Sequence, residues 1–100
     1  MLLFKRYFVE AILSGRKTQT RRLHKSLRKV DSRQACKYDF LGKPFCFVVI
    51  KQCFQQKLGD VSEADISKEG FASRQEFIDY FGDKYDPGLV VVVYEFMVCT

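Results

Sequence analysis

Several residue types and patterns are scarce in this chain, and each absence excludes a class of protein. Tryptophan is absent, so ten Phe and five Tyr carry the aromatic volume. No apolar run approaches the roughly 20 residues that a membrane-spanning helix needs, and Lys5 and Arg6 interrupt the apolar start, which is too short for the core of a signal peptide. We therefore expect a soluble, cytoplasmic protein that makes no contact with a membrane.

Closely spaced metal ligands are also missing. The cysteines are Cys36, Cys46, Cys53 and Cys99, without a CxxC pair, and His24 is the single histidine. A structural zinc site needs Cys or His ligands in close pairs. Cys46 and Cys53 lie an odd number of residues apart in one predicted strand, so an unbroken strand points them to opposite faces. We expect four free thiols, and neither a metal nor a cofactor.

Linkers and repeats are absent, which leaves no sign of a second domain. With 100 residues, 47% of them apolar, the chain has the length and the core material of one domain. We expect residues 1–100 to form a single domain, whose oligomeric state the sequence does not fix.

Local patterns predict a mixture of strands and short helices. An apolar stripe at positions 8, 9, 12 and 13 marks one face of a helix, and Gly15 follows where a helix end favours positive φ. Ser73 and Glu76 have the spacing of a capping box. The other expected elements are strands at 1–5, 18–23, 44–54 and 89–98, a short helix at 62–68, an irregular segment at 24–42 with exposed basic residues, and a turn at 86–88. This order favours an α+β fold around a small mixed β-barrel, because a flat sheet of so few strands leaves its edges unpaired.

Positive charge is concentrated in one segment. The net charge is +5, but segment 16–37 holds nine basic residues and one acid, a local charge of +8 that leaves −3 for the rest. Such density favours a phosphate-bearing or otherwise anionic partner, whereas a merely solvated loop is the simpler alternative.

The run Ala11–Arg22 resembles the signature of ASCH domains, in which a helix ends in Gly and is followed by K-T-x-T-x-R. Four further pieces agree in order and spacing with that superfamily: 41–45, 58–63, 69–71 and 94–96. The resemblance covers nearly the whole chain and implies a PUA-like mixed β-barrel with short helices packed around it.

The same resemblance implies a function and a set of site residues. Within the superfamily, the chain is most similar to the small bacterial amidohydrolases that remove the acetyl group from N4-acetylcytidine. Their catalytic residues correspond to Lys17, Thr20 and Glu69, with Glu63 as a competing choice for the acid, and Arg22 is a candidate for substrate binding. A nucleoside is then the expected small-molecule partner.

These residue types suit amide hydrolysis. A Thr hydroxyl needs a neighbouring base, and Lys17 can be that base if burial or nearby cations lower its pKa. Glu69 can deliver a proton to the departing nitrogen. On a straight strand, positions three apart point to opposite faces, so Lys17 and Thr20 can share a pocket only if the backbone bends between Arg16 and Thr18, which Gly15 favours.

Other interpretations of the sequence remain open. Thr20 can be a simple strand former, Lys17 and Glu69 solvated charges, and Arg22 a surface residue. RNA is a possible partner if segment 16–37 is the footprint of a non-catalytic RNA-binding module, with Tyr38 and Phe40 available to stack on bases. A protein-interaction module is a third possibility. The Lys/Thr/Glu set favours the enzyme.

Overall fold

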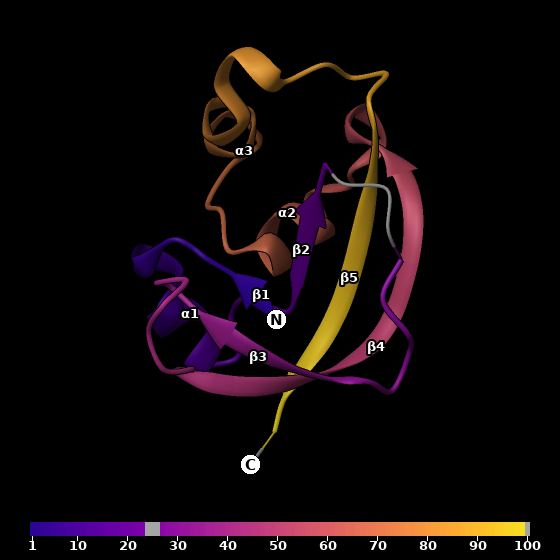
Figure 1. Cartoon of the computed structure of the whole chain (residues 1–100). Helices are drawn as coiled ribbons and strands as arrows, with labels where there is room; N and C mark the ends of the chain where they lie inside the picture. The colour runs from indigo at the N-terminus through magenta and orange to yellow at the C-terminus, as the bar shows by residue number, and fades with distance from the viewer. Residues whose placement is uncertain (24–26, 100) are drawn as a thin grey trace.

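The computed structural model describes residues 1–23 and 27–99, so His24 and Lys25 lie outside the described residues. Figure 1 shows the path of the chain. In chain order, the elements are β1 (Leu2–Leu3), a 3-10 turn (Arg6–Phe8), α1 (Val9–Leu13), β2 (Gln19–Arg22), β3 (Arg33–Lys37), β4 (Cys46–Lys57), a 3-10 turn (Leu58–Asp60), α2 (Glu63–Glu69), α3 (Arg74–Phe81), a 3-10 turn (Gly82–Lys84) and β5 (Val90–Val98).

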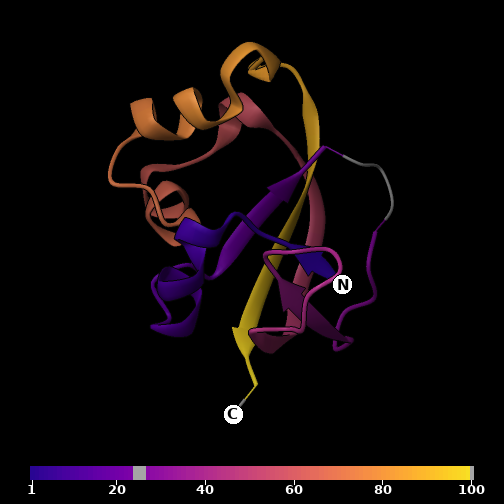
Figure 2. The ribbon, with the colours of Figure 1, turned by 60° about the vertical axis from the view of Figure 1, so that its left-hand side comes forward.

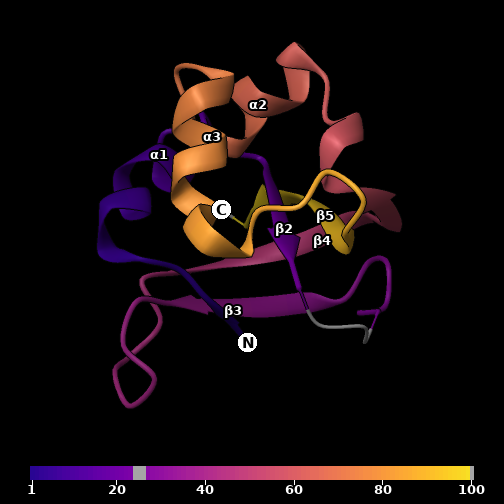
Figure 3. The same cartoon turned by 90° about the horizontal axis from the view of Figure 1, so that it is seen from above.

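The strands form one mixed sheet in the order β1-β3-β4-β5-β2. β1 pairs with β3 in parallel, and the other pairs are antiparallel. The sheet curls into a half-barrel, and the helices gather on one side of it (Figures 2 and 3). The predicted α+β class and small mixed barrel are therefore confirmed, in the form of a curled sheet whose two edges are β1 and β2.

The interior strand β5 is largely buried on both faces, because it lies between two apolar clusters. Val92, Tyr94 and Phe96 face the first cluster, which includes Phe4, Phe8 and Ile12 from the start of the chain. Val91 and Val93 face the second, which includes Ile66 of α2 and Phe77 of α3. This is the period of two that a strand imposes on its side chains. The strand thereby holds the N-terminal helix and the two later helices around one sheet.

The helix ends follow the predicted signals. The Ser73 hydroxyl accepts from the Glu76 amide at 3.2 Å, as the capping box predicts. Ser62 accepts from the Asp65 amide at 3.1 Å and starts α2 in the same way. Gly15 has φ of +82°, so its predicted positive φ is confirmed.

Segment 24–42, expected to be irregular, contains β3, so that prediction is wrong. This strand has no β-branched residue, and it forms by pairing with β1, more than 30 positions earlier, on one side and with the following strand β4 on the other. Among the basic residues expected to be exposed in 24–42, Lys29 and Arg33 are exposed, whereas Arg28 and Lys37 are half-buried. Lys17 and Arg21 are buried, so segment 16–37 is not merely a solvated loop. No described helix is long and apolar enough to cross a membrane.

A break in the register of β4 changes the directions of its cysteines. The pairing of β4 with β5 shifts between Ile50 and Gln52, as a β-bulge does. Cys46 and Cys53 therefore both pack against the first apolar cluster instead of pointing to opposite faces. Cys36 lies opposite Cys46, and burial raises the pKa of its thiol to about 12. All four thiols are free in the structure.

Candidate active site

Lys17 reaches the interior because the chain turns sharply after α1. The positive φ of Gly15 reverses the backbone, and the Lys17 amide then donates to the Ala11 carbonyl at 2.9 Å. The next amide, of Thr18, donates to the Lys68 carbonyl at 2.7 Å and ties the turn to α2. This is the bend that the sequence required for Lys17 and Thr20 to share a pocket.

The ammonium group of Lys17 is enclosed by acceptors. Its side chain is 1% exposed. Nζ donates to the carbonyl of Gln19 at 2.8 Å, to the carbonyl of Glu69 at 2.8 Å and to Oε1 of Glu69 at 3.1 Å. An ammonium has three protons, so these contacts use all of them. Lys17 is thus fixed in one orientation.

Opposing effects act on the pKa of Lys17. Burial is the largest and lowers the pKa below its usual value of 10.5. The Glu69 carboxylate opposes this shift, while the charges of Arg22 and Arg21 add to it. The net effect lowers the pKa and makes the neutral amine more accessible than in a solvated lysine.

Glu69 is the last residue of α2 and lies between two cations. Its Oε1 accepts from Lys17, and its Oε2 accepts from Arg21 Nη1 at 2.9 Å. The next residue, Gly70, ends the helix with φ of +97°, and a Cβ there would lie 3.4 Å from Cβ of Lys17. The helix end therefore favours glycine through its positive φ, and Lys17 packs directly against this turn.

Arg21 connects the site to the surrounding elements, and the sequence did not single it out as a site residue. Its guanidinium donates to Glu69, to Oε1 of Gln19 at 3.0 Å and to Oε1 of Gln56 at 3.0 Å. It also lies 3.6 Å from Asp65 Oδ2. The periodicity of β2 is the only signal that places Gln19 and Arg21 on one face, and it does not say what they contact.

Arg22 differs from Arg21 in having no polar partner among residues 1–23 and 27–99. Its Nε is buried without a hydrogen bond, and its guanidinium lies 4.7 Å from the ring centre of Phe4. Burial lowers its pKa. A cation held this way has capacity for an acceptor that the protein itself does not provide.

A small cavity of about 40 Å³, the inner pocket, brings the four predicted residues together. Lys17, Thr20, Arg22 and Glu69 all line it, together with Arg21 and the rings of Phe4, Phe8 and Tyr80. Glu63, the competing acid, lies elsewhere: it is exposed and pairs with Arg74 at 2.8 Å. Solvated positions for Lys17 and Glu69 are therefore wrong.

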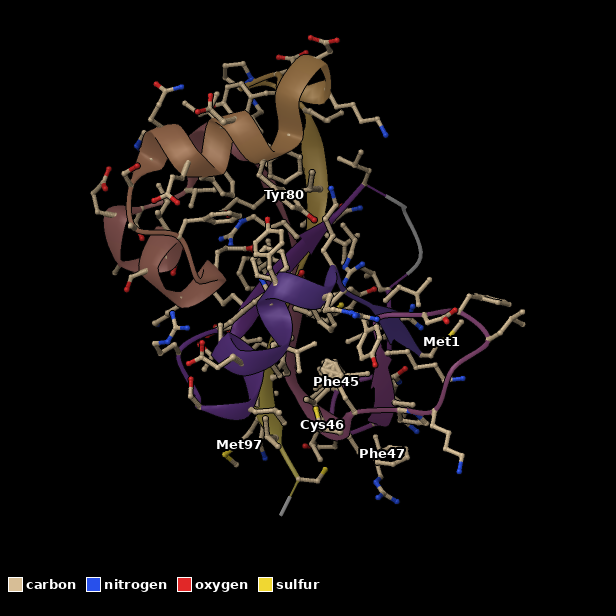
Figure 4. The ribbon with its side chains drawn as sticks, turned by 90° about the vertical axis from the view of Figure 1, so that its left-hand side faces the viewer. Met1, Phe45, Cys46, Phe47, Tyr80 and Met97 are labelled. Atoms are coloured by element: carbon tan, nitrogen blue, oxygen red, sulfur yellow. The ribbon has the colours of Figure 1, made fainter. Side chains whose placement is uncertain are left out.

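The inner pocket adjoins a larger cavity of about 410 Å³, the outer pocket. Arg21, Arg22, Tyr80 and Phe81 line both cavities. Tyr80, a residue of α3 that the sequence did not single out, projects its side chain below that helix in Figure 4. Its ring centre is 5.5 Å from that of Phe8. The outer pocket has the size of a small-molecule site, and the inner pocket forms its deep end.

A third cavity, also of about 410 Å³, opens on the other side of Lys17. Thr18, Lys51 and Met97 line it, whereas Thr20 and Glu69 do not. In Figure 4, Met97 lies near the lower end of the molecule and Tyr80 in its upper half. Thr18 and Thr20 therefore line different cavities.

Comparison with known proteins identifies the fold. No family model and no curated protein matches the chain. Among solved structures, it is similar to an ASCH domain from Lactobacillus crispatus JV V101, with a TM-score of 0.74, 19% identity, and coverage of 92% of this chain and 70% of the other. Protein EF3133 from Enterococcus faecalis V583 matches with a TM-score of 0.75, 19% identity and coverage of 93% and 67%. ASCH from Zymomonas mobilis matches with a TM-score of 0.70 and 20% identity, and the match covers 97% of this chain and 67% of the other. The chain therefore has the fold of ASCH domains, as its sequence resemblance predicted.

Proposed function

We propose that this protein is an amidohydrolase that converts N4-acylated cytidine or cytosine into the free base or nucleoside and a carboxylate. The observation that carries the proposal is the inner pocket, in which a hydroxyl, a buried amine and a carboxylate lie together (Thr20, Lys17 and Glu69). These groups are a nucleophile, a base and a proton carrier for amide hydrolysis.

The first half of the proposed reaction forms an acyl-enzyme. Oγ of Thr20 bonds to the acyl carbon, and its proton passes to the neutral amine of Lys17 while the carbonyl becomes an oxyanion. Arg22, which has no polar partner among the described residues, can donate to that oxyanion. The C–N4 bond then breaks, and N4 takes a proton that Lys17 relays through Glu69, 3.1 Å away.

The second half releases the acid. A water molecule attacks the Thr20 ester, Lys17 accepts its proton, and the carboxylate leaves as the Thr20 hydroxyl is restored. The inner pocket, at about 40 Å³, has room for roughly one water or a short acyl group. The cytosine ring would then lie in the outer pocket beside Tyr80.

The direct test is incubation with N4-acetylcytidine and chromatographic detection of cytidine and acetate. An N-acetylated alkyl amine is a suitable control substrate, because its amine is a poorer leaving group than the conjugated cytosine nitrogen, and we expect it to remain intact. A failure to release cytidine at any pH from 6 to 10 would refute the proposed reaction.

The pH dependence should report on Lys17. Because the neutral amine is the active form and burial lowers its pKa, kcat/KM should rise about tenfold per pH unit and level off below pH 10.5. Lys17→Arg should remove both this rise and the activity, since a guanidinium accepts no proton near neutral pH. A rate that falls as the pH rises would contradict the role of Lys17 as base. Thermal unfolding of the variant serves as the check on folding.

RNA binding is the second candidate function, supported by two exposed aromatic rings, one of them next to a cation. Tyr38 is 44% exposed and Phe40 62% exposed, in the loop between β3 and β4. The Arg6 guanidinium lies 4.5 Å from the ring centre of Tyr38. Such rings can stack on unpaired bases while basic residues contact phosphates.

Binding of a single-stranded RNA should weaken steeply with salt if this surface is used. Lys29 and Arg33 are both exposed. The double variant Lys29→Glu/Arg33→Glu should reduce the affinity for RNA. The slope of log K against log salt concentration should also become shallower, by about 0.7 for each phosphate that the variant no longer neutralises. Lys57→Glu is a matched control at the far end of β4. RNA binding that is absent at low salt, measured by fluorescence anisotropy, would exclude this candidate.

A further inference from the structure

The charge of the outer pocket exceeds what a neutral nucleoside requires. Among the described residues, four basic ones line the pocket (Lys5, Arg21, Arg22 and Lys84) and no acidic one does. Lys5 enters from the segment after β1, with Nζ 5.3 Å from the ring centre of Tyr80. Lys84 enters from the turn after α3. Two distant parts of the chain thus place cations around one cavity.

Most of this charge is not neutralised within the protein. Arg21 is matched by Glu69 and Asp65. Among residues 1–23 and 27–99, no ion pair joins Lys5, Arg22 or Lys84 to a carboxylate. Cations that surround a cavity attract an anion of matching size, and about 410 Å³ accommodates a ribose with a phosphate.

We propose that the outer pocket binds a phosphate group on the ribose of the substrate. This inference rests on the proposed function and specifies its substrate class as N4-acylated cytidine phosphates. With the acyl group in the inner pocket and the base beside Tyr80, the ribose and its phosphate extend toward Lys5 and Lys84. The phosphate belongs either to a mononucleotide or to an RNA chain, and both present the same oxygens to these lysines.

The test compares three substrates: N4-acetylcytidine, its 5′-monophosphate and a trinucleotide with the modified cytidine at its centre. A phosphorylated substrate should have a kcat/KM about tenfold above that of the nucleoside at low salt, and the advantage should shrink as salt screens the charges. Lys5→Gln and Lys84→Gln should each reduce this advantage about two- to fivefold. Lys57→Gln, which removes the same charge outside both pockets, should leave it unchanged.

Calorimetric binding of the products separates this inference from the proposed reaction, because it needs no turnover. Cytidine 5′-monophosphate should bind more tightly than cytidine, and Lys84→Gln should weaken the difference. If the phosphate binds but no acetylated compound is hydrolysed, the proposed function is wrong and the phosphate site stands. If hydrolysis occurs with no preference for either phosphorylated substrate, the phosphate site is wrong. A preference for the trinucleotide assigns the phosphate to RNA, and a preference for the monophosphate assigns it to a nucleotide.

Discussion

Thr20→Ala is expected to abolish the release of cytidine from N4-acetylcytidine, with a loss of at least about a thousandfold in kcat. The substitution removes the one hydroxyl that we assign as nucleophile and leaves the lining of the inner pocket otherwise intact. Since Thr20 and Lys17 act as one unit, the double variant Lys17→Arg/Thr20→Ala should be hardly slower than Thr20→Ala alone. Steady-state kinetics with purified variants measures both effects.

Thr18→Ala is the matched control for this experiment. It removes the same hydroxyl two residues away, but Thr18 lines the cavity on the other side of Lys17. Its kcat should stay close to that of the unmodified protein. Equal release of cytidine by the unmodified protein and Thr20→Ala would show that no acyl-threonine forms, and would overturn the assignment of Thr20 as the nucleophile.

Glu69→Gln is expected to lower the free energy of unfolding by about 3–5 kcal/mol, because it leaves buried cations without their anion. Lys17 and Arg21 both contact the Glu69 carboxylate, and the side chains of all three are at most 5% exposed. The remaining acid near Arg21 is Asp65, at 3.6 Å and partly exposed. Urea unfolding followed by circular dichroism measures the loss, and turnover of the acetylated substrate should slow in parallel.

Glu63→Gln provides the comparison on the same helix. Glu63 also pairs with an arginine, Arg74, but its side chain is 75% exposed. A solvated ion pair contributes at most about 1 kcal/mol, so this variant should be nearly as stable as the unmodified protein. A Glu69→Gln protein that is no less stable than Glu63→Gln would mean that the buried pairs do not stabilise the fold.

The sequence predicted those parts of the fold that depend on residues close together in the chain. The strand character of 44–54 and 89–98 and the cap at Ser73 depend on neighbouring residues, and all appear as β4, β5 and the start of α3. β3 could not be predicted, because its pairing of Cys36 with Cys46 depends on the folded sheet. The bulge after Ile50 likewise follows from the fit of β4 to β5.

The candidate site could also be predicted only in part, because some of its contacts join residues that are distant in the chain. The motif placed Lys17, Thr20 and Arg22 next to one another, but their burial depends on Glu69, which lies 52 positions from Lys17. Charge density alone suggested solvated cations, and it missed Arg21 as a site residue, since charge alone does not reveal which cations meet buried acceptors. Tyr80 lacked a sequence signal because helical periodicity assigns it to a face but not to a cavity.

The short edges of the sheet bear on how the protein behaves at high concentration. β1 has two residues and β2 has four, whereas the interior strands β4 and β5 have twelve and nine. An edge this short offers few free N–H and C=O groups to a strand of another chain, which is a common start of aggregation. The longer open edge lies in β4, because β3 pairs only with its residues 46–49, and among the described residues 51–57 have a partner strand on the β5 side alone. Lys51 and Lys57 lie at the two ends of this stretch, and charged side chains on an open edge oppose the addition of a strand from another chain.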